Sequence, residues 1–240
     1  MRLLIQYFLS LIFIFQMYIM MAVITCVFIP LVIINKSFAL TAINAWCNWV
    51  KVSAKLIVGI KTEIRGTVPT NSVLVIAKHQ SFLDIILIVS SLKRPKFIMK
   101  KEILITPIIG FWAKKIGCIP IDRGKKGAAI KEMIKAVHES NKTSPGQLII
   151  FPQGTRVAPN VRAPYKIGSG VLYSELKQDC HPVATNVGVL WPRRSILRKR
   201  GTAVIEFLPP IKSGLDTKEF MDLIENNIEI ASEKLMQEII

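Results

Sequence analysis

A segment from Leu3 to Ile34 carries no charged side chain and is almost entirely apolar, and it limits where the rest of the chain can fold. At about 1.5 Å per helical residue, it exceeds the roughly 30 Å that a helix needs to cross the hydrocarbon core of a bilayer. A removable signal peptide is the rival interpretation, but the apolar region is too long and no small-residue cleavage site follows it. We therefore expect residues 1–35 to be a transmembrane or membrane-embedded segment. Pro30 leaves open a tilted span, a kinked span or two shorter interfacial helices.

Positive charge is distributed unevenly around this segment. Arg2 precedes it, whereas Lys36, Lys51, Lys55 and Lys61 follow it. Basic residues concentrate in the loops on the cytoplasmic side of a membrane. The pattern therefore predicts a protein of the bacterial inner membrane, with its remaining chain on the cytoplasmic side.

The formal net charge of +16 requires an anionic partner, and the membrane segment favours anionic membrane lipids over nucleic acid or an acidic carrier protein. A basic cluster follows Trp191 and consists of Arg193, Arg194, Arg198, Lys199 and Arg200. Modules that bind nucleic acid interleave aromatic side chains with their charges, whereas a single tryptophan precedes this cluster. We expect no nucleic-acid partner and interpret the cluster as a patch that docks on a membrane or on a carrier protein.

The spacing of the cysteines suggests neither a metal site nor disulfide bonds. The chain has four cysteines, namely Cys26, Cys47, Cys118 and Cys180, without any C-x-x-C or Cys/His cluster. Such scatter indicates neither a zinc site nor a disulfide framework. We expect no metal, and a reducing cytoplasm agrees with free cysteines.

The chain after the membrane segment alternates between short β-rich runs and helical patterns. A second, amphipathic interfacial helix is predicted within residues 36–60, over Ala39–Ile60. The β-rich runs are Glu63–Arg65, Val73–Ala77, Lys96–Met99, Cys118–Ile121, Gln147–Phe151, Pro182–Asn186 and Ala203–Phe207. The helical stretches are Phe82–Leu92, Glu102–Lys115, Ala128–Glu139, Gly168–Lys177 and Thr217–Glu238.

This alternation predicts an α/β fold with a mixed, largely parallel sheet flanked by helices and preceded by one or more N-terminal membrane helices. Residues 61–240 should form one catalytic domain, because no Pro/Gly/Ser-rich linker or repeat divides them. In such sheets, sites form at the carboxyl ends of the strands.

The run Lys78-His79-Gln80-Ser81-Phe82-Leu83-Asp84 places a histidine and a carboxylate at the end of a predicted strand. A neutral imidazole accepts a proton from an alcohol when a carboxylate holds its other nitrogen in the right tautomer. On a continuous helix, five steps of about 100° would put the two side chains roughly 140° apart. His79 is therefore expected on a turn before a helix that Ser81 can cap. Asp84 could instead complete a capping box with Ser81, and that alternative stays open.

Two further motifs follow predicted strands. Gly117-Cys118-Ile119-Pro120-Ile121-Asp122-Arg123 ends in an arginine that can grip a phosphate with both arms of its guanidinium. Phe151-Pro152-Gln153-Gly154-Thr155-Arg156 combines a tight glycine turn, a hydroxyl and an arginine. Backbone N–H groups freed by the glycine, together with Arg156, would form an anion site. A surface charge or an ion pair is the plainer interpretation of each arginine alone, and three motifs at strand ends weigh against it.

These motifs and a fourth, His181-Pro182-Val183-Ala184, occur in the order of the 1-acyl-sn-glycerol-3-phosphate acyltransferase family, which the chain resembles over residues 60–210. That family carries N-H-x4-D, a G-x-x-x-x-D-R-like block, F-P-E-G-T-R and a short Pro-Val block. The resemblance implies transfer of a fatty acyl group from an acyl-carrier-protein or coenzyme A thioester to the sn-2 hydroxyl of 1-acyl-sn-glycerol 3-phosphate. The product would be phosphatidic acid, made in phospholipid biosynthesis without a metal or other cofactor.

The resemblance also implies roles for individual residues. His79 would remove the proton from the acceptor hydroxyl, and Asp84 would hold and charge-stabilise the imidazole. Backbone N–H groups near Lys78 or Gly154 would stabilise the oxyanion. The acceptor phosphate would be bound by Lys100, Arg123, Gly154, Thr155 and Arg156.

Two residues depart from the family pattern. Lys78 replaces the usual Asn and Gln153 replaces the usual Glu, which shifts the local charge by two units toward positive. Neither departure removes the base or the arginine, so they bear on the choice of acceptor more than on the type of reaction.

Two alternative functions remain open. An acyltransferase that acts on glycerol 3-phosphate or on another lysolipid, such as a lyso-aminolipid, would use the same base. A non-catalytic, lipid-binding membrane protein on the same scaffold is different in class. Loss of His79 or Asp84 would mark that second alternative, and both residues are present.

Overall fold

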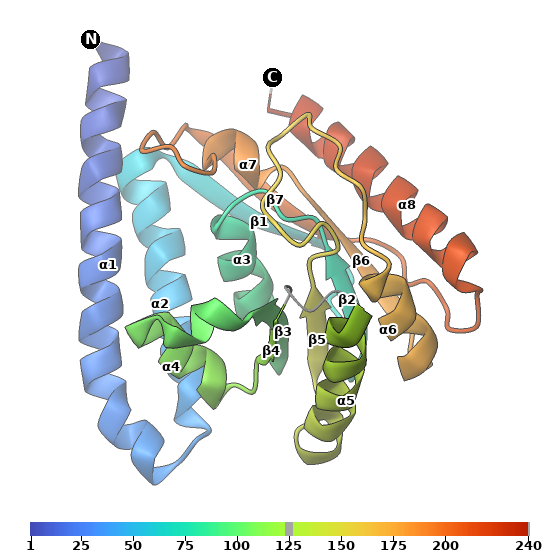
Figure 1. Cartoon of the computed structure of the whole chain (residues 1–240). Helices are drawn as coiled ribbons and strands as arrows, with labels where there is room; N and C mark the ends of the chain where they lie inside the picture. Colours follow the sequence, from blue (N-terminus) through green and yellow to red (C-terminus); the bar gives the residue numbers. More distant parts are fainter. Residues whose placement is uncertain (123–126, 240) are drawn as a thin grey trace.

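The computed structural model of the chain describes residues 1–122 and 127–239, and these residues contain a seven-stranded sheet (Figure 1). Its strands are β1 (Ile60–Gly66), β2 (Leu74–Ala77), β3 (Pro95–Lys100), β4 (Ile119–Ile121), β5 (Gln147–Ile150), β6 (Cys180–Thr185) and β7 (Gly201–Phe207). They lie in the order β1-β7-β6-β2-β5-β3-β4. β6 and β7 pair antiparallel, and every other neighbouring pair is parallel. The predicted mixed, largely parallel sheet is confirmed.

The central strands are buried on both faces, which explains why they read as continuous apolar runs. Successive side chains of a strand point to opposite faces. Leu74 and Ile76 of β2 therefore enter one hydrophobic core, whereas Val75 and Ala77 enter the other. The sheet thus separates two hydrophobic cores, one on each of its faces.

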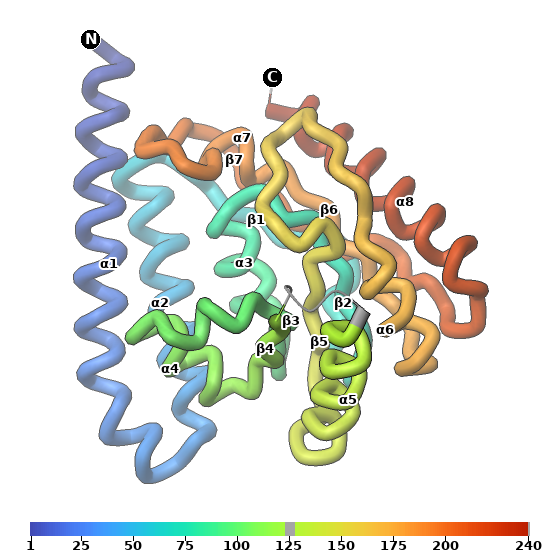
Figure 2. The backbone as a smooth tube through the Cα atoms, in the orientation of Figure 1, coloured from blue at the N-terminus to red at the C-terminus, as the bar shows by residue number. Residues whose placement is uncertain are grey.

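Helices cover both faces of the sheet (Figure 2). One core receives side chains from α1, α2, α3 and the short α7, and the other receives them from α5, α6 and α8. α4 packs on α1 and α2 through Trp112. The helices are α1 (Arg2–Ile34), α2 (Phe38–Ser53), α3 (Leu83–Ser91), α4 (Pro107–Lys115), α5 (Gly127–Thr143), α6 (Gly168–Leu176), α7 (Val187–Leu190) and α8 (Thr217–Gln237).

α1 is attached to the rest of the protein along most of its length. Phe13 and Met17 are buried in the core. Near one end, Gln6 Nε2 donates hydrogen bonds to the carbonyl oxygens of Val58 and Arg198, at 2.9 and 2.8 Å. Toward the other end, Thr25 Oγ1 accepts a hydrogen bond of 2.9 Å from the Trp112 indole. α1 is therefore a structural part of the domain.

The opposite side of α1 is exposed and apolar. Its exposed residues include Leu4, Phe8, Leu11, Phe15 and Tyr18. In the described part of the chain, α1 is the one helix that is long and apolar enough to cross a membrane, by length and composition alone. The helix continues through Pro30 to Ile34.

Two predicted helices differ most from the structure in their limits. The helix predicted over Ala39–Ile60 ends at Ser53, and a π-helical turn follows over Ala54–Val58. Gly59, with φ of +76°, then ends the helical conformation, and β1 starts at the next residue. The helix predicted over Glu102–Lys115 is a 3₁₀ turn followed by α4, which begins at Pro107 because proline suits the first turn and breaks a helix interior.

Candidate active site

His79 lies on the turn between β2 and α3, as the sequence predicts, and its side chain meets Asp84. His79 Nδ1 is 2.9 Å from Asp84 Oδ1. The other carboxylate oxygen of Asp84 accepts hydrogen bonds of 2.8 Å from the backbone N–H groups of Gln80 and Ser81. One oxygen of Asp84 therefore contacts the histidine and the other stabilises the turn before α3, whose N-cap residue is Phe82 and not Ser81.

The His79 ring is held in place from two further directions. It stacks on Phe151, with ring centroids 4.0 Å apart and an interplanar angle of 16°. The His79 carbonyl oxygen accepts a hydrogen bond of 2.8 Å from the Val157 backbone N–H. Since Nδ1 is engaged with Asp84, Nε2 is the ring nitrogen that remains for a substrate proton. The arrangement is that of an oriented general base.

The loop after β5 carries the second predicted group of site residues. Gly154 adopts φ of +71°, and its N–H donates to the Phe151 carbonyl oxygen at 3.0 Å. The Lys78 N–H likewise donates to Val183, at 3.0 Å. These two N–H groups therefore already have backbone partners, and the oxyanion donors expected near Lys78 or Gly154 stay a prediction. The glycine is required for the tight turn that brings Thr155 and Arg156 to the cavity.

The remaining predicted residues differ in their placement. Lys100 ends β3 at the edge of the cavity and forms an ion pair of 3.0 Å with Glu102, with both side chains largely exposed. Arg123 lies outside the described residues. Arg193, which was predicted to belong to a basic docking patch, also lines the cavity. Its Nη1 donates to the Arg156 carbonyl oxygen at 2.8 Å and to Thr155 Oγ1 at 3.3 Å.

Sequence reasoning missed the role of Arg193 because no local pattern sets it apart from its basic neighbours. It lies 37 residues beyond Arg156, in the segment between α7 and β7. The one hint in the sequence was Trp191, two residues earlier. Its side chain is buried in the structure, where it anchors this segment to the domain.

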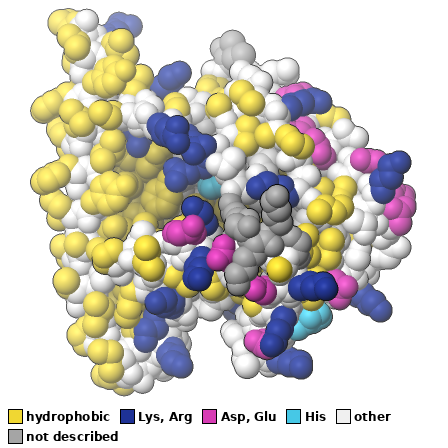
Figure 3. All heavy atoms as spheres, in the orientation of Figure 1, with side chains coloured by type: hydrophobic (Ala, Val, Ile, Leu, Met, Phe, Trp, Pro, Cys, Tyr) yellow, Lys and Arg dark blue, Asp and Glu magenta, His cyan; other side chains and the backbone are white. Residues whose placement is uncertain are grey.

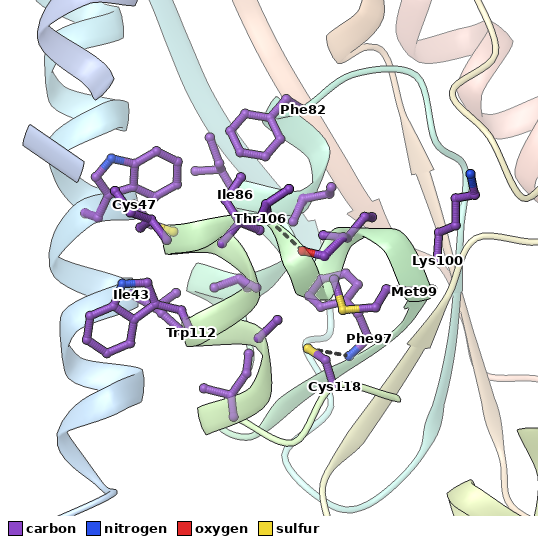
Figure 4. A pocket seen from close by; sticks show the side chains of 18 of the residues that line it. Ile43, Cys47, Phe82, Ile86, Phe97, Met99, Lys100, Thr106, Trp112 and Cys118 are labelled. Carbon is purple, nitrogen blue, oxygen red and sulfur yellow. Dashed lines mark hydrogen bonds between the residues drawn. The ribbon is translucent and has the colours of Figure 1, made fainter. Parts of the chain in front are cut away.

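The site opens into an apolar cavity of about 510 Å³ (Figure 4). Its walls come from α1, α2, α3, β3 and α4, and Figure 4 shows Ile43, Phe82, Ile86, Phe97 and Trp112 among the lining side chains, with Lys100 apart from them. At the mouth, the lining changes to polar and cationic side chains, which are His79, Lys100, Thr155, Arg156 and Arg193. In the space-filling view, Lys and Arg side chains gather around the hollow, and apolar side chains cover α1 beside it (Figure 3).

The cavity also contains a cysteine, Cys118, which is a poor nucleophile. Burial raises the pKa of its thiol to about 11. Its Sγ accepts a hydrogen bond of 3.5 Å from the Phe97 N–H. The thiol therefore stays protonated near neutral pH.

Comparison with known proteins places this site in a family. The sequence model of the acyltransferase family matches residues 59–186, which contain His79, Asp84 and the loop that ends in Arg156. The chain belongs to the acyltransferase family. Family membership confirms the resemblance found in the motifs, and the individual site residues remain predictions.

Several curated relatives are 1-acyl-sn-glycerol-3-phosphate acyltransferases. The chain is 25% identical to the Pseudomonas aeruginosa protein over 169 residues, which are 70% of this chain and 65% of that protein. It is 27% identical to the Streptococcus pneumoniae protein over 168 residues, covering 69% and 58% of the two chains. The Bacillus subtilis protein is 32% identical over 142 residues, covering 57% and 67%. The chain thus spans about half to two thirds of the length of these relatives.

A solved structure shows the same fold. The crystal structure of the 1-acyl-sn-glycerophosphate acyltransferase of Thermotoga maritima matches with a TM-score of 0.77 and 18% sequence identity, over 98% of both chains. The match covers the N-terminal helices as well as the sheet, so the whole architecture of this chain has a counterpart in that protein.

Proposed function

We propose that this acyltransferase moves a fatty acyl group from an acyl-carrier-protein or coenzyme A thioester to the sn-2 hydroxyl of 1-acyl-sn-glycerol 3-phosphate and so forms phosphatidic acid. The observation that carries the proposal is the position of the His79–Asp84 pair between an apolar cavity and a cationic mouth. The donor has a long apolar chain with its reactive carbonyl at one end. The acceptor has a hydroxyl close to a phosphate. The two halves of the site suit these two substrates.

In the reaction, His79 Nε2 takes the hydroxyl proton while the acceptor oxygen bonds to the carbonyl carbon of the thioester. Asp84 stabilises the resulting imidazolium through Nδ1. Collapse of the tetrahedral intermediate breaks the carbon–sulfur bond. The departing sulfur then takes the proton from His79, which restores the neutral imidazole and leaves a free thiol.

The cavity and its mouth supply the binding energy. Each CH₂ group of an acyl chain that leaves water contributes about 0.8 kcal/mol, so the apolar cavity beside His79 favours a long chain. Arg156 can bind a phosphate with both arms of its guanidinium, and Lys100 and Arg193 add positive charge at the same mouth. Gly154, Thr155 and Arg123 complete the proposed phosphate-binding group.

We also propose that α1 lies along the membrane surface instead of crossing the bilayer. It is hydrogen-bonded to the domain from Gln6 to Thr25, a distance of about 28 Å at about 1.5 Å per residue. A crossing helix would carry the attached parts of the domain, including the Arg198 segment, through the hydrocarbon, where charged groups are costly. Partial burial of the exposed apolar side satisfies α1 without this cost. The cytoplasmic face is the side that we propose, from the charge bias around the segment.

The exposed side of α1 offers a test of this attachment. Phe8 and Phe15 are 64% and 71% exposed, so replacing both by glutamate should leave the core intact. We expect the double variant to release most of the protein from anionic vesicles in a flotation assay, and the remaining binding to weaken with salt. Ile167→Glu, an exposed apolar position just before α6, is the control and should float like the original chain. Undiminished flotation of the Phe8/Phe15 variant would contradict the proposed orientation.

Product identification tests the reaction itself. The purified chain, offered both thioester donors, should convert 1-acyl-sn-glycerol 3-phosphate to phosphatidic acid, measured by mass spectrometry. Glycerol 3-phosphate and a lyso-aminolipid are the competing acceptors, and preference for either would move the assignment to that reaction. Binding of lipid without any acylated product from the whole panel would favour the non-catalytic alternative.

A further inference from the structure

Lys78 and Gln153, the two departures from the family pattern, meet at one residue of α8. Their side chains are 2% and 3% exposed, and both reach Glu229, which is equally buried. Lys78 Nζ forms an ion pair with Glu229 Oε2. Gln153 Nε2 is 3.5 Å from Glu229 Oε1, and the Tyr165 hydroxyl donates to the same oxygen at 3.1 Å.

The charges of this cluster balance only when Glu229 is counted. The usual Asn and Glu would carry one negative charge, whereas Lys78 and Gln153 carry one positive charge. Glu229 brings the sum for the three residues to zero. Burial, with the charge of Glu229, raises the pKa of Tyr165, so the phenol remains a neutral donor. An unpaired ammonium or carboxylate at this depth would be strongly destabilising, so each charge requires the other.

The cluster joins the two parts of the active site. Lys78 directly precedes His79, and Gln153 directly precedes Gly154. Glu229 therefore holds one turn through an ion pair and the other through an amide, each a single residue away from a proposed site residue. The distance between the base and the phosphate-binding loop has to match the glycerol backbone of the acceptor. A misplacement of about 1 Å can lower the rate by about 10²-fold.

We propose that Glu229 is a positioning residue for acyl transfer, which holds the His79 turn and the Gly154–Arg156 loop at their working separation and supplies the buried carboxylate that position 153 lacks. This inference rests on the proposed function. It explains why a neutral side chain stands at position 153, since a carboxylate there would approach that of Glu229 to about the present 3.5 Å. It also explains the buried lysine next to the base, which is the counter-charge of Glu229.

Moving the carboxylate from the helix to the loop tests the proposal. Glu229→Gln leaves Lys78 unpaired, and Gln153→Glu adds a second carboxylate, so each single variant should lose about 10²-fold in kcat/KM for the acceptor. The double variant Gln153→Glu/Glu229→Gln keeps one carboxylate and one lysine, and it should recover to within about tenfold of the original chain. Glu233→Gln is the matched control, because Glu233 lies one turn further along α8 in an exposed ion pair with Arg162 and should have little effect.

Kinetic constants separate positioning from loss of folded protein. A smaller folded fraction lowers kcat and leaves both Michaelis constants unchanged. Displacement of the two turns lowers kcat and raises the acceptor constant, with the donor constant little changed. Melting temperatures of all variants show which of them are folded. If a single variant does not fold, the activity of the folded double variant still tests the proposal.

Two results would overturn the proposal. The first is Glu229→Gln with the original kcat and acceptor constant. The second is a folded double variant that is no more active than Glu229→Gln, or than background where that single variant does not fold. An original chain that acylates no acceptor in the panel would instead remove the proposed function, so the two failures are distinguishable.

Discussion

Replacing His79 by alanine is expected to abolish acyl transfer, with a loss of at least about 10³-fold in turnover, because no other group of the described cavity mouth is placed to accept the hydroxyl proton. The side chain lies at the cavity and lends the core one stacking contact with Phe151, so the fold should survive. Turnover with saturating donor and acceptor, together with the melting temperature, measures both effects. Acyl transfer near the original rate in purified His79→Ala protein would contradict the proposed mechanism.

Asp84→Asn is the informative companion to this variant. An amide preserves the shape but removes the charge that stabilises the imidazolium and favours the wrong tautomer, so turnover should fall by about 10²-fold or more. Asp84 also accepts two backbone hydrogen bonds, which gives this variant a loss of stability that His79→Ala lacks. A lower melting temperature for Asp84→Asn than for His79→Ala would confirm the double role of the carboxylate.

Arg156→Ala is expected to raise the acceptor Michaelis constant strongly, with a far smaller effect on the thioester donor. The guanidinium at the cavity mouth would contact the phosphate in both the bound substrate and the transition state, and such uniform binding appears in the Michaelis constant. Arg156→Lys should rescue only part of the loss, because an ammonium cannot make the bidentate contact. Steady-state kinetics with each substrate varied in turn measures the split.

Arg193→Ala is the control for the same loop. Arg193 donates to Thr155 and to the Arg156 backbone, so its loss should raise the acceptor constant less than loss of Arg156 itself. If Arg156→Ala left acceptor saturation unchanged and impaired donor saturation, the loop would belong to the thioester side of the site.

The strands and the His79–Asp84 contact could be predicted because they depend on residues that are close together in the sequence. Val73–Ala77 is apolar at every position, which is typical of a strand buried on both faces, and the angle between positions on a helix required His79 to lie outside one. Two limits were harder to predict, namely the end of the helical turn after α2 and the start of α4. They depend on Gly59 and Pro107, whose effects depend on their exact place in the turn.

Contacts between distant segments were not predictable from local patterns. Lys78 and Glu229 are 151 residues apart, and they meet because β2 and β6 are neighbours in the sheet and α8 packs against β6. A buried lysine beside the base appeared in the sequence as an unexplained departure, and the strand order supplies its explanation. The cavity could not be predicted for the same reason. Its walls come from five elements, and no short sequence pattern indicates that these elements lie close together.

The attachment of α1 to the domain also sets an order of events during synthesis. Gln6 binds the Arg198 carbonyl, 192 residues further along the chain. At about 5–20 residues per second, the ribosome needs roughly 10 to 40 s to make that partner after α1 has emerged. During this interval α1 can pack on α2, but it lacks its contacts with the segment around Arg198. The cavity lining, which includes Arg193, is therefore complete only after nearly the whole chain has been made.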